Sequence, residues 1–171
     1  LPKHLEDIEP AFHHIEATAL PQWSDQGAQY TLVAGQAFNQ TSPVPVHSDL
    51  FMMAITTTEA HTFTAKGNVK GEIGICIVSG HITACDQTIT AGNMLVSKIE
   101  DVCTIDIAAN SHILIFGGEP FPEERHIFWN FVSHSKEKIE SAKEKWKAKL
   151  FPKVANDTSY VPLPKPPNFS K

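Results

Sequence analysis

Residues 117–133 read GGEPFPEERHIFWNFVS, and this stretch separates a series of short β-like segments from one helical segment. Its Gly-Gly pair and its two prolines predict the end of the preceding strand, because glycine frees φ and proline lacks an N–H donor. Residues 126–132 alternate bulky apolar with polar side chains over part of their length, which predicts a half-buried strand. The stretch therefore predicts a β body that is followed by a helix.

Upstream of this stretch, short apolar or β-branched segments recur at roughly ten-residue spacing, with Gly, Asn and Asp between them. This spacing is typical of an antiparallel sandwich or barrel. The segment IGICIV at residues 73–78 is apolar almost throughout, which predicts burial on both faces. The fold class is therefore predicted as all-β, an antiparallel jelly-roll β-barrel with strands at 11–16, 20–23, 28–34, 50–58, 61–64, 73–78, 81–84, 88–90, 94–97, 102–108 and 112–116.

Downstream, the period of the apolar residues changes to that of one α-helix. Ile139, Ala142, Trp146 and Leu150 fall on one helical face, and Ser135 is a suitable N-cap. We expect Trp146 and Ile139 to anchor this helix against the barrel, and the spacing of Lys136 with Glu140 and of Glu144 with Lys147 to form surface pairs. The predicted organisation is a β-barrel domain over residues 1–134, a packing helix over 135–150 and an extended, Pro-rich tail over 151–171.

Composition bounds the class of protein. A chain of 171 residues with 42% hydrophobic residues can form one domain with its own core. Its three cysteines suggest no disulfide framework, which favours a reducing, cytoplasmic location. No apolar run reaches the ~18 residues of a membrane span. The chain begins with Leu1 rather than Met, and we expect it to be trimmed or to be a piece of a longer protein.

Charge is unevenly distributed along the chain, although the net charge is only −5. Residues 1–134 contain 15 acidic and 5 basic residues, whereas the remainder contains 4 acidic and 9 basic ones. A basic tail on an acidic body could contact nucleic acid. A solvated, Lys-rich helix is the interpretation we favour, because no basic strand with interleaved aromatic residues supports nucleic-acid binding.

Several segments are similar to the C-terminal half of pirin-like proteins, which are bicupins with two β-barrels in one polypeptide. The similarity lies in LPKHLEDIEPAF at residues 1–12, LVAGQAFNQTSP at 32–43, the stretch at 117–133, SKEKIESAKEKW at 135–146, and the Phe151-Pro152 pair. The resemblance implies a cupin fold. It also implies that iron is held by three His and one Glu in an N-terminal cupin outside this chain. Members of the family are linked to quercetin 2,3-dioxygenase activity, and others to regulation through protein partners.

The cupin metal pattern tests whether this half has a site of its own. It places two His one residue apart on a strand, where they face the same side, and adds a Glu and a later His. Anchored on Gly80, the Glu position falls on Ile73 and the two His positions fall on Gly67 and Val69. Anchored on Gly92, the last His position falls on Cys103, and Glu72 lies on the opposite face from Ile73. We therefore predict no catalytic, cofactor-binding or metal-binding residue in this chain.

The remaining polar residues suggest only weak sites. A chance metal site could combine three of the scattered histidines, of which His13 and His14 are adjacent, His47 and His61 could meet across a hairpin, and His81, His112 and His126 lie on separate predicted strands. Hydrogen bonding to backbone is their default role. Cys76 and Cys103 are expected to be small hydrophobic residues rather than reactive thiols. Glu123 and Glu124 are expected to form a solvated surface rather than an acid–base pair.

Three functional hypotheses remain open. The first is a metal-free cupin half that braces a metal-binding N-terminal cupin and offers a surface for protein contacts. The second is a scaffold within a quercetin 2,3-dioxygenase, a metal-dependent oxidoreductase. The third is a stand-alone regulatory or ligand-binding cupin that uses the barrel interior as a pocket. No cofactor is expected in this chain. The expected partners are the N-terminal cupin and, by exchange of the tail, a second copy in a homodimer, with no membrane and no nucleic acid.

Overall fold

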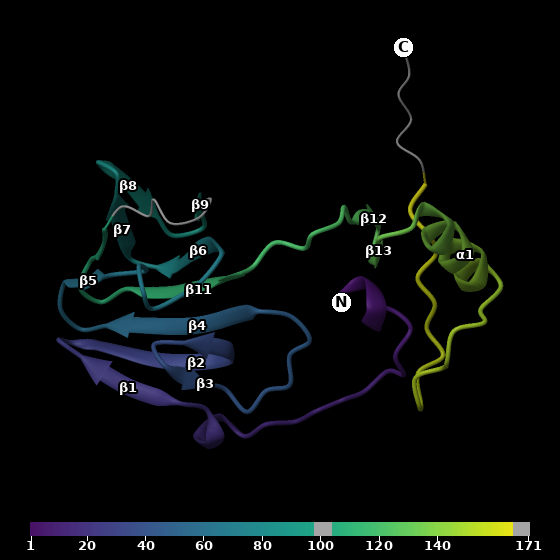
Figure 1. Cartoon of the computed structure of the whole chain (residues 1–171), viewed down its shortest axis with the longest axis horizontal. Helices are drawn as coiled ribbons and strands as arrows, with labels where there is room; N and C mark the ends of the chain where they lie inside the picture. Colours follow the sequence, from purple (N-terminus) through teal and green to yellow (C-terminus); the bar gives the residue numbers. More distant parts are fainter. Residues whose placement is uncertain (98–103, 166–171) are drawn as a thin grey trace, which may run out of the picture. The chain divides into compact units, whose positions relative to one another are not determined.

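The structure is a computed structural model that describes residues 1–97 and 104–165. The chain separates into two compact units (Figure 1). The first unit comprises residues 1–2 and 8–120, and the second combines residues 3–7 with the chain from Phe121 onward. Each unit is described by itself below.

Two antiparallel sheets make up the first unit. The larger has seven strands, namely β1 (Gln22–Asp25), β2 (Ala28–Ala37), β3 (Gln40–Thr41), β4 (Leu50–Thr57), β6 (Glu72–Ser79), β9 (Met94–Ser97) and β11 (His112–Gly118). Their order is β1-β2-β4-β11-β6-β9, with β3 paired to β2 (Figure 1). The smaller sheet contains β5 (His61–Phe63), β7 (His81–Ala84), β8 (Gln87–Thr90) and β10 (Ile105–Ile107), in the order β5-β10-β7-β8.

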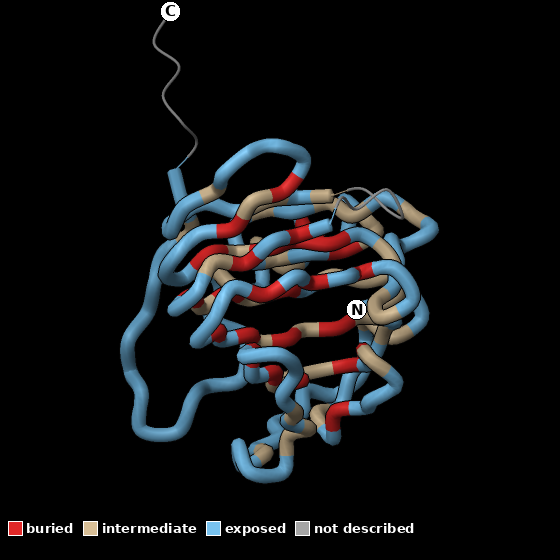
Figure 2. The backbone as a smooth tube through the Cα atoms, turned by 90° about the vertical axis from the view of Figure 1, so that its left-hand side faces the viewer, coloured by how far each residue is buried: buried red, intermediate tan, exposed pale blue. Residues whose placement is uncertain are grey.

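One apolar core joins the two sheets. Buried positions alternate with exposed or half-buried ones along most strands, as expected where one sheet face is covered (Figure 2). The core is rich in isoleucine because β-branched side chains fit a pleated surface, and its fully buried members include Ile55, Ile75, Ile77, Ile82, Ile105, Ile107, Ile113 and Ile115. The prediction of an all-β, antiparallel jelly-roll is confirmed. Neither sheet closes on itself within the described residues, so the unit is a sandwich with open edges.

The structure corrects two predictions of strands. Residues 11–16 form no strand, because none of the described strands pairs with them. The 3₁₀ turn η2 (Ala17–Ala19) follows them. Residues 126–132 form a hairpin, β12 (His126–Phe128) and β13 (Phe131–Ser133), rather than one strand. Trp129 has φ +56°, and this left-handed residue lets the chain reverse between the two strands.

The prediction that residues 73–78, which lie in β6, are buried on both faces is also wrong. Ile73, Ile75 and Ile77 are buried in the core, but on the other face Cys76 is only half-buried and Val78 is 48% exposed. A continuous apolar run therefore marks a strand whose outer side chains are not covered in this chain.

The second unit contains the helix α1 (Lys136–Lys147) and the 3₁₀ turn η1 (Lys3–Leu5). The Ser135 side chain accepts a hydrogen bond from the Lys138 N–H, which confirms the predicted N-cap. Ile139 is the one buried residue of the helix, which packs on β12 and β13. No helix among the described residues is long and apolar enough to cross a membrane.

Trp146 has different neighbours from those expected. Its ring lies in a cluster within the second unit, with centroid distances of 5.2 Å to Trp129, 5.6 Å to Phe151 and 5.8 Å to Tyr160. Its Nε1–H donates to the carbonyl oxygen of Val161 at 2.8 Å. The extended tail therefore returns to the helix of its own chain at Tyr160 and Val161.

Surface pairs on the helix follow the prediction in part. Glu144 pairs with Lys147 at 2.6 Å as expected, but Glu140 pairs with Lys143 at 2.7 Å and not, as expected, with Lys136. Lys138 is 2.7 Å from Asp7. Acidic partners thus neutralise several of the lysines that make this part of the chain basic.

Candidate functional site

A cavity of about 990 Å³ opens in the first unit. It is formed by the turn between β2 and β3, the segment before β4, and the loop of residues 65–71 that leads into β6. Phe38, Asn39, Gly67 and Gly71 in these turns have positive φ, which bends the two loops at the cavity. The sequence showed these stretches only as turns, because no periodic pattern marks a cavity between two loops.

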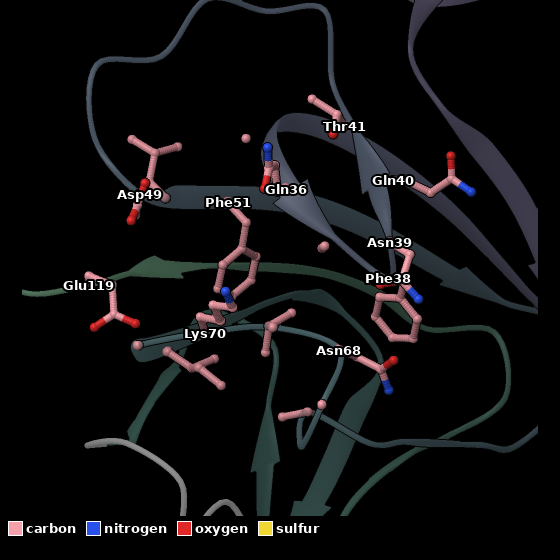
Figure 3. A pocket seen from close by; sticks show the side chains of 18 of the residues that line it. Gln36, Phe38, Asn39, Gln40, Thr41, Asp49, Phe51, Asn68, Lys70 and Glu119 are labelled. Atoms are coloured by element: carbon pink, nitrogen blue, oxygen red, sulfur yellow. The ribbon is translucent and has the colours of Figure 1, made fainter.

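The side chains around the cavity divide by chemistry. The ring of Phe51 and the side chain of Lys70 lie near its centre, and Asp49 and Glu119 lie together at one side (Figure 3). Phe38, Asn39 and Asn68 lie at the opposite side (Figure 3). The cavity therefore combines aromatic surface with amide, carboxylate and ammonium groups, which is a composition suited to a small polar organic molecule.

Three of the four positions that the cupin pattern gives to metal ligands line this cavity. Gly67, Val69 and Ile73, which occupy the two His positions and the Glu position of the pattern, all line it. Glu72 is exposed while Ile73 is buried, so Glu72 lies on the other face of β6 as predicted. The fourth position, Cys103, lies outside the described residues. The fold thus brings together the three described positions that would hold a metal, and none of them carries a ligating side chain.

The residues present do not fit the iron that the family implies. None of the nine histidines, all of which lie in the described ranges, lines the cavity. The carboxylates of Asp49 and Glu119 share it with Lys66 and Lys70, whose ammonium charges oppose a divalent cation. Within residues 1–97 and 104–165, no three His, Cys, Asp or Glu side chains are arranged to hold a metal ion.

The histidines considered from the sequence are dispersed. His13 and His14 precede β1, and His14 contacts Glu16 at 3.0 Å on the surface. His47 and His81 are exposed, and His112 is half-buried in β11. His126 lies 3.7 Å from Glu124. The chance metal site is therefore not formed by these residues in the described part of the chain.

His61 is the exception, because it is buried in the sandwich. Its Nε2 is 2.6 Å from the Tyr30 hydroxyl, and its Nδ1 is buried with no hydrogen-bond partner among the described residues. Burial raises the pKa of the Tyr30 hydroxyl to about 12, and the Asp25 carboxylate adds to this shift. Tyr30 therefore keeps its proton at neutral pH, and its ring stacks on Trp23. Neither Tyr30 nor His61 lines the cavity, so the pair belongs to the core.

The other candidates also have structural roles. Glu123 lies 3.5 Å from Arg125 and Glu124 lies 3.7 Å from the Nδ1 of His126, so the two carboxylates have different partners and do not form an acid–base pair. Cys76 is a free, half-buried thiol in β6. Cys85 is disulfide-bonded, which the sequence interpretation did not anticipate.

Two antiparallel sheets around one aliphatic core are the architecture of a double-sheet jelly roll, the class of fold to which cupin domains belong. A family model described as the pirin C-terminal cupin domain matches residues 52–152. The chain belongs to the pirin family, and the matched region is the C-terminal cupin domain of that family.

Individual relatives agree with this assignment. A pirin-like protein of Caulobacter vibrioides is 32% identical over 166 residues, which are 96% of this chain and 57% of that protein. A Pseudomonas aeruginosa protein named "Putative quercetin 2,3-dioxygenase" is 29% identical over 148 residues, which are 85% of this chain and 46% of that protein. The chain therefore spans about half the length of the curated relatives it matches.

A solved structure extends the similarity to the fold of the whole chain. The crystal structure of quercetin 2,3-dioxygenase from Acinetobacter baumannii matches with a TM-score of 0.85 and 26% identity. The match covers 100% of this chain and 58% of that structure. The chain is thus a pirin C-terminal cupin domain with relatives that are named as quercetin 2,3-dioxygenases.

Proposed function

We propose that this chain is a metal-free structural half of a pirin-like protein, which braces a metal-binding N-terminal cupin and offers a surface for protein contacts. The observation that carries the proposal is the cavity at the cupin ligand positions. Gly67 and Val69 line the cavity and stand at the positions that the cupin pattern gives to two histidines, and Ile73 lines it at the position of the glutamate. Glycine and aliphatic side chains donate no electron pair to a metal, so this cavity lacks the chemistry of the cupin site.

The arrangement of the core supports a bracing role. The interior of the sandwich is filled with fully buried aliphatic side chains from both sheets. A close-packed core of this kind stabilises the fold of the domain, and its one buried polar pair described above, Tyr30 with His61, does not line the cavity. The iron or other divalent metal of the protein would then be held by the N-terminal cupin.

A dioxygenase is the alternative for the whole protein. It is supported by the names of the Pseudomonas relative and of the Acinetobacter crystal structure. In that case this chain would contribute scaffold to a quercetin 2,3-dioxygenase, and the redox metal would act in the other half. A stand-alone ligand-binding cupin is a third candidate, and the size and mixed polarity of the cavity favour it.

Metal analysis of the purified 171-residue chain tests the proposal. After purification without chelators, iron, manganese and nickel should each be far below about one ion per chain, because a cupin site needs four ligands. Oxygen uptake with quercetin should match a buffer control. A stoichiometric metal that is lost in a histidine variant such as His61→Ala, or quercetin turnover by the chain, would contradict the proposal.

A further inference from the structure

The cavity of the first unit has two fixed sides, each held by a backbone hydrogen bond between segments that are distant in the sequence. At one side, the N–H of Phe38 donates to the carbonyl oxygen of Asn68 at 2.8 Å, which joins the turn between β2 and β3 to the loop of residues 65–71. At the other side, the N–H of Glu119 donates to the carbonyl oxygen of Asp49 at 2.9 Å. The two sides are therefore in place before a ligand enters, which lowers the entropy cost of binding.

The fold does not use the polar side chains that surround the cavity. Asn39 and Gln40 lie at the first side, Lys70 lies near the centre, and Asp49 and Glu119 lie at the second side (Figure 3). None of these five side chains makes a hydrogen bond or an ion pair with another described residue. Their donors and acceptors are thus available to a ligand, with no partner in the described part of the chain to displace.

The ionised groups of the cavity balance one another. The lining contains the ammonium groups of Lys66 and Lys70 and the carboxylates of Asp49 and Glu119. An anion would be attracted by the first two groups and repelled by the others, and a cation would meet the reverse. A small zwitterion would leave the side of Asn39 empty. A hydroxyl group can pair with all of them, because it donates to a carboxylate and accepts from an ammonium or an amide.

The size and the aromatic surface of the cavity narrow the class of ligand further. Its volume of about 990 Å³ is at the upper end of the ~300–1,000 Å³ of small-molecule sites. The ring of Phe38, which lines it, packs on Trp23 and Tyr30 with centroid distances of 5.5 Å to each and is therefore held in place. The C–H groups of a sugar ring can pack on the electron-rich face of an aromatic ring, while its hydroxyls point outward to polar groups.

We propose that the cavity binds an uncharged carbohydrate of about two sugar rings, with one ring packed on Phe38 and with hydroxyls bonded to Asn39, Lys70 and Glu119. The inference goes beyond the proposed function, because bracing another cupin requires no ligand. It assigns a class of ligand to the ligand-binding alternative.

NMR titration of the isotope-labelled chain tests the proposal. The probes are the disaccharides maltose, cellobiose, lactose and sucrose, and the charged comparisons are acetate, propylammonium and glycine. Binding is measured from the shifts of the backbone amides at low and at high ionic strength, before and after treatment with EDTA.

Two variants remove one ligand contact each, and each has a matched control. Glu119→Ala removes the carboxylate at one side, and Glu72→Ala removes a carboxylate that lies on the other face of β6, outside the lining. Asn39→Gly removes the amide at the opposite side without new backbone strain, because Asn39 has φ +56°. Asn110→Gly makes the same change at φ +57°, away from the cavity. Thermal unfolding of all four variants checks that the fold is kept.

At least one disaccharide should bind, with shifts centred on residues 36–41 and 65–71. Its affinity should not change with ionic strength, because the ligand has no charge to be screened. E119A should bind this disaccharide at least about tenfold more weakly and N39G at least about threefold more weakly, since a hydrogen bond to a charged group contributes more than a neutral one. E72A and N110G should stay within about twofold of the original chain.

Three outcomes would overturn the inference and leave the proposed function standing, since metal analysis tests that function separately. They are no binding of any disaccharide at up to about 10 mM, tighter binding of a charged probe, and equal losses in the cavity variants and their controls. Disaccharide binding that disappears after EDTA would show that a metal in this chain holds the ligand, and would overturn both the inference and the metal-free proposal.

Discussion

Glu6 holds the start of the C-terminal helix through His134, although 128 residues separate the two in the sequence. Its carboxylate accepts the backbone N–H of His134 at 2.9 Å and lies 2.8 Å from the Nδ1 of the same residue. The Ser133 hydroxyl donates to it at 2.9 Å. Within the second unit, residues 3–7 are thereby held to the start of the helix by a nearly buried carboxylate, whose side chain is 8% exposed.

The first prediction concerns Glu6 and pH. Burial alone raises the pKa of this carboxyl, but the hydrogen bonds from His134 and Ser133 and the charge of His134 outweigh it and lower the pKa to about 2. A folded-state pKa below the unfolded value of 4.5 stabilises the fold above pH 4.5, and this contribution is lost as the pH falls from 4.5 towards 2. For the full shift of the pKa, the contribution of Glu6 to the free energy of unfolding is on the order of 3 kcal/mol.

Thermal unfolding between pH 7 and pH 3 measures this contribution. Glu6→Gln should be clearly less stable than the original chain at pH 7, and the difference should shrink as the pH falls. Glu9→Gln is the control, because Glu9 is exposed and should change little at any pH. A difference for Glu6→Gln that stays constant down to pH 3 would show that its charge does not contribute.

The second prediction concerns two glycines that line the cavity. Gly35 and Gly67 have φ of +73° and +80°, so both substitutions to alanine incur left-handed strain. A Cβ on Gly35 would overlap the Leu50 carbonyl oxygen, whereas a Cβ on Gly67 meets no atom within 4 Å. We expect Gly67→Ala to cost about 1 kcal/mol and Gly35→Ala at least about 3 kcal/mol in the free energy of unfolding. Equal losses in urea titrations would mean that β4 can move away from Gly35.

The third prediction concerns Trp146. Trp146→Ala removes the ring that contacts Trp129, Phe151 and Tyr160, and should destabilise the second unit by about 2–4 kcal/mol, since the residue is half-buried. Trp146→Phe keeps a ring but loses the hydrogen bond to Val161, and should cost about 1 kcal/mol. Hydrogen exchange of the amides of α1 measures both. Unchanged exchange in Trp146→Ala would show that Ile139 alone holds the helix.

The fourth prediction concerns the tail. Tyr160 and Val161 contact Trp146 of the same chain, so a version that ends at Leu150 should lose stability in the second unit. The homodimer by tail exchange would make these contacts between two copies. Light scattering behind size exclusion distinguishes contacts within one chain from exchange between two copies. Exchange requires that the full chain is a dimer and that the version ending at Leu150 is a monomer. Equal mass and equal stability for both versions would show that the tail has no packing role.

The local pattern of apolar residues was sufficient to predict much of the fold. The alternation of apolar residues located β2, β4, β6 and β11, and Ser135 with the helical period located α1, because these signals arise within one element. The same level of information led to the prediction that this half holds no metal, since the side chains of Gly67 and Val69 cannot ligate in any conformation, and this stays a prediction. The resemblance in residues 117–133 also identified the family, because a sequence motif is a local property of the chain.

Contacts between distant segments could not be predicted in this way. The segment 126–132 alternates like a strand, and only the left-handed Trp129 and the packing of both arms against α1 make it a hairpin. Likewise, residues 11–16 have strand propensity but none of the described strands pairs with them. A backbone ladder depends on a partner strand, and propensity within one segment does not supply it.

The sequence by itself determined the β architecture, the helix that follows it and the residue types at positions 67, 69 and 73. Tertiary structure alone decided that Gly67, Val69 and Ile73 line one cavity and that Glu6 meets His134. The physical reason is that side-chain type and period are local properties. Which residues become neighbours depends on strand register and on the closure of long loops, and both are settled when the sheets assemble.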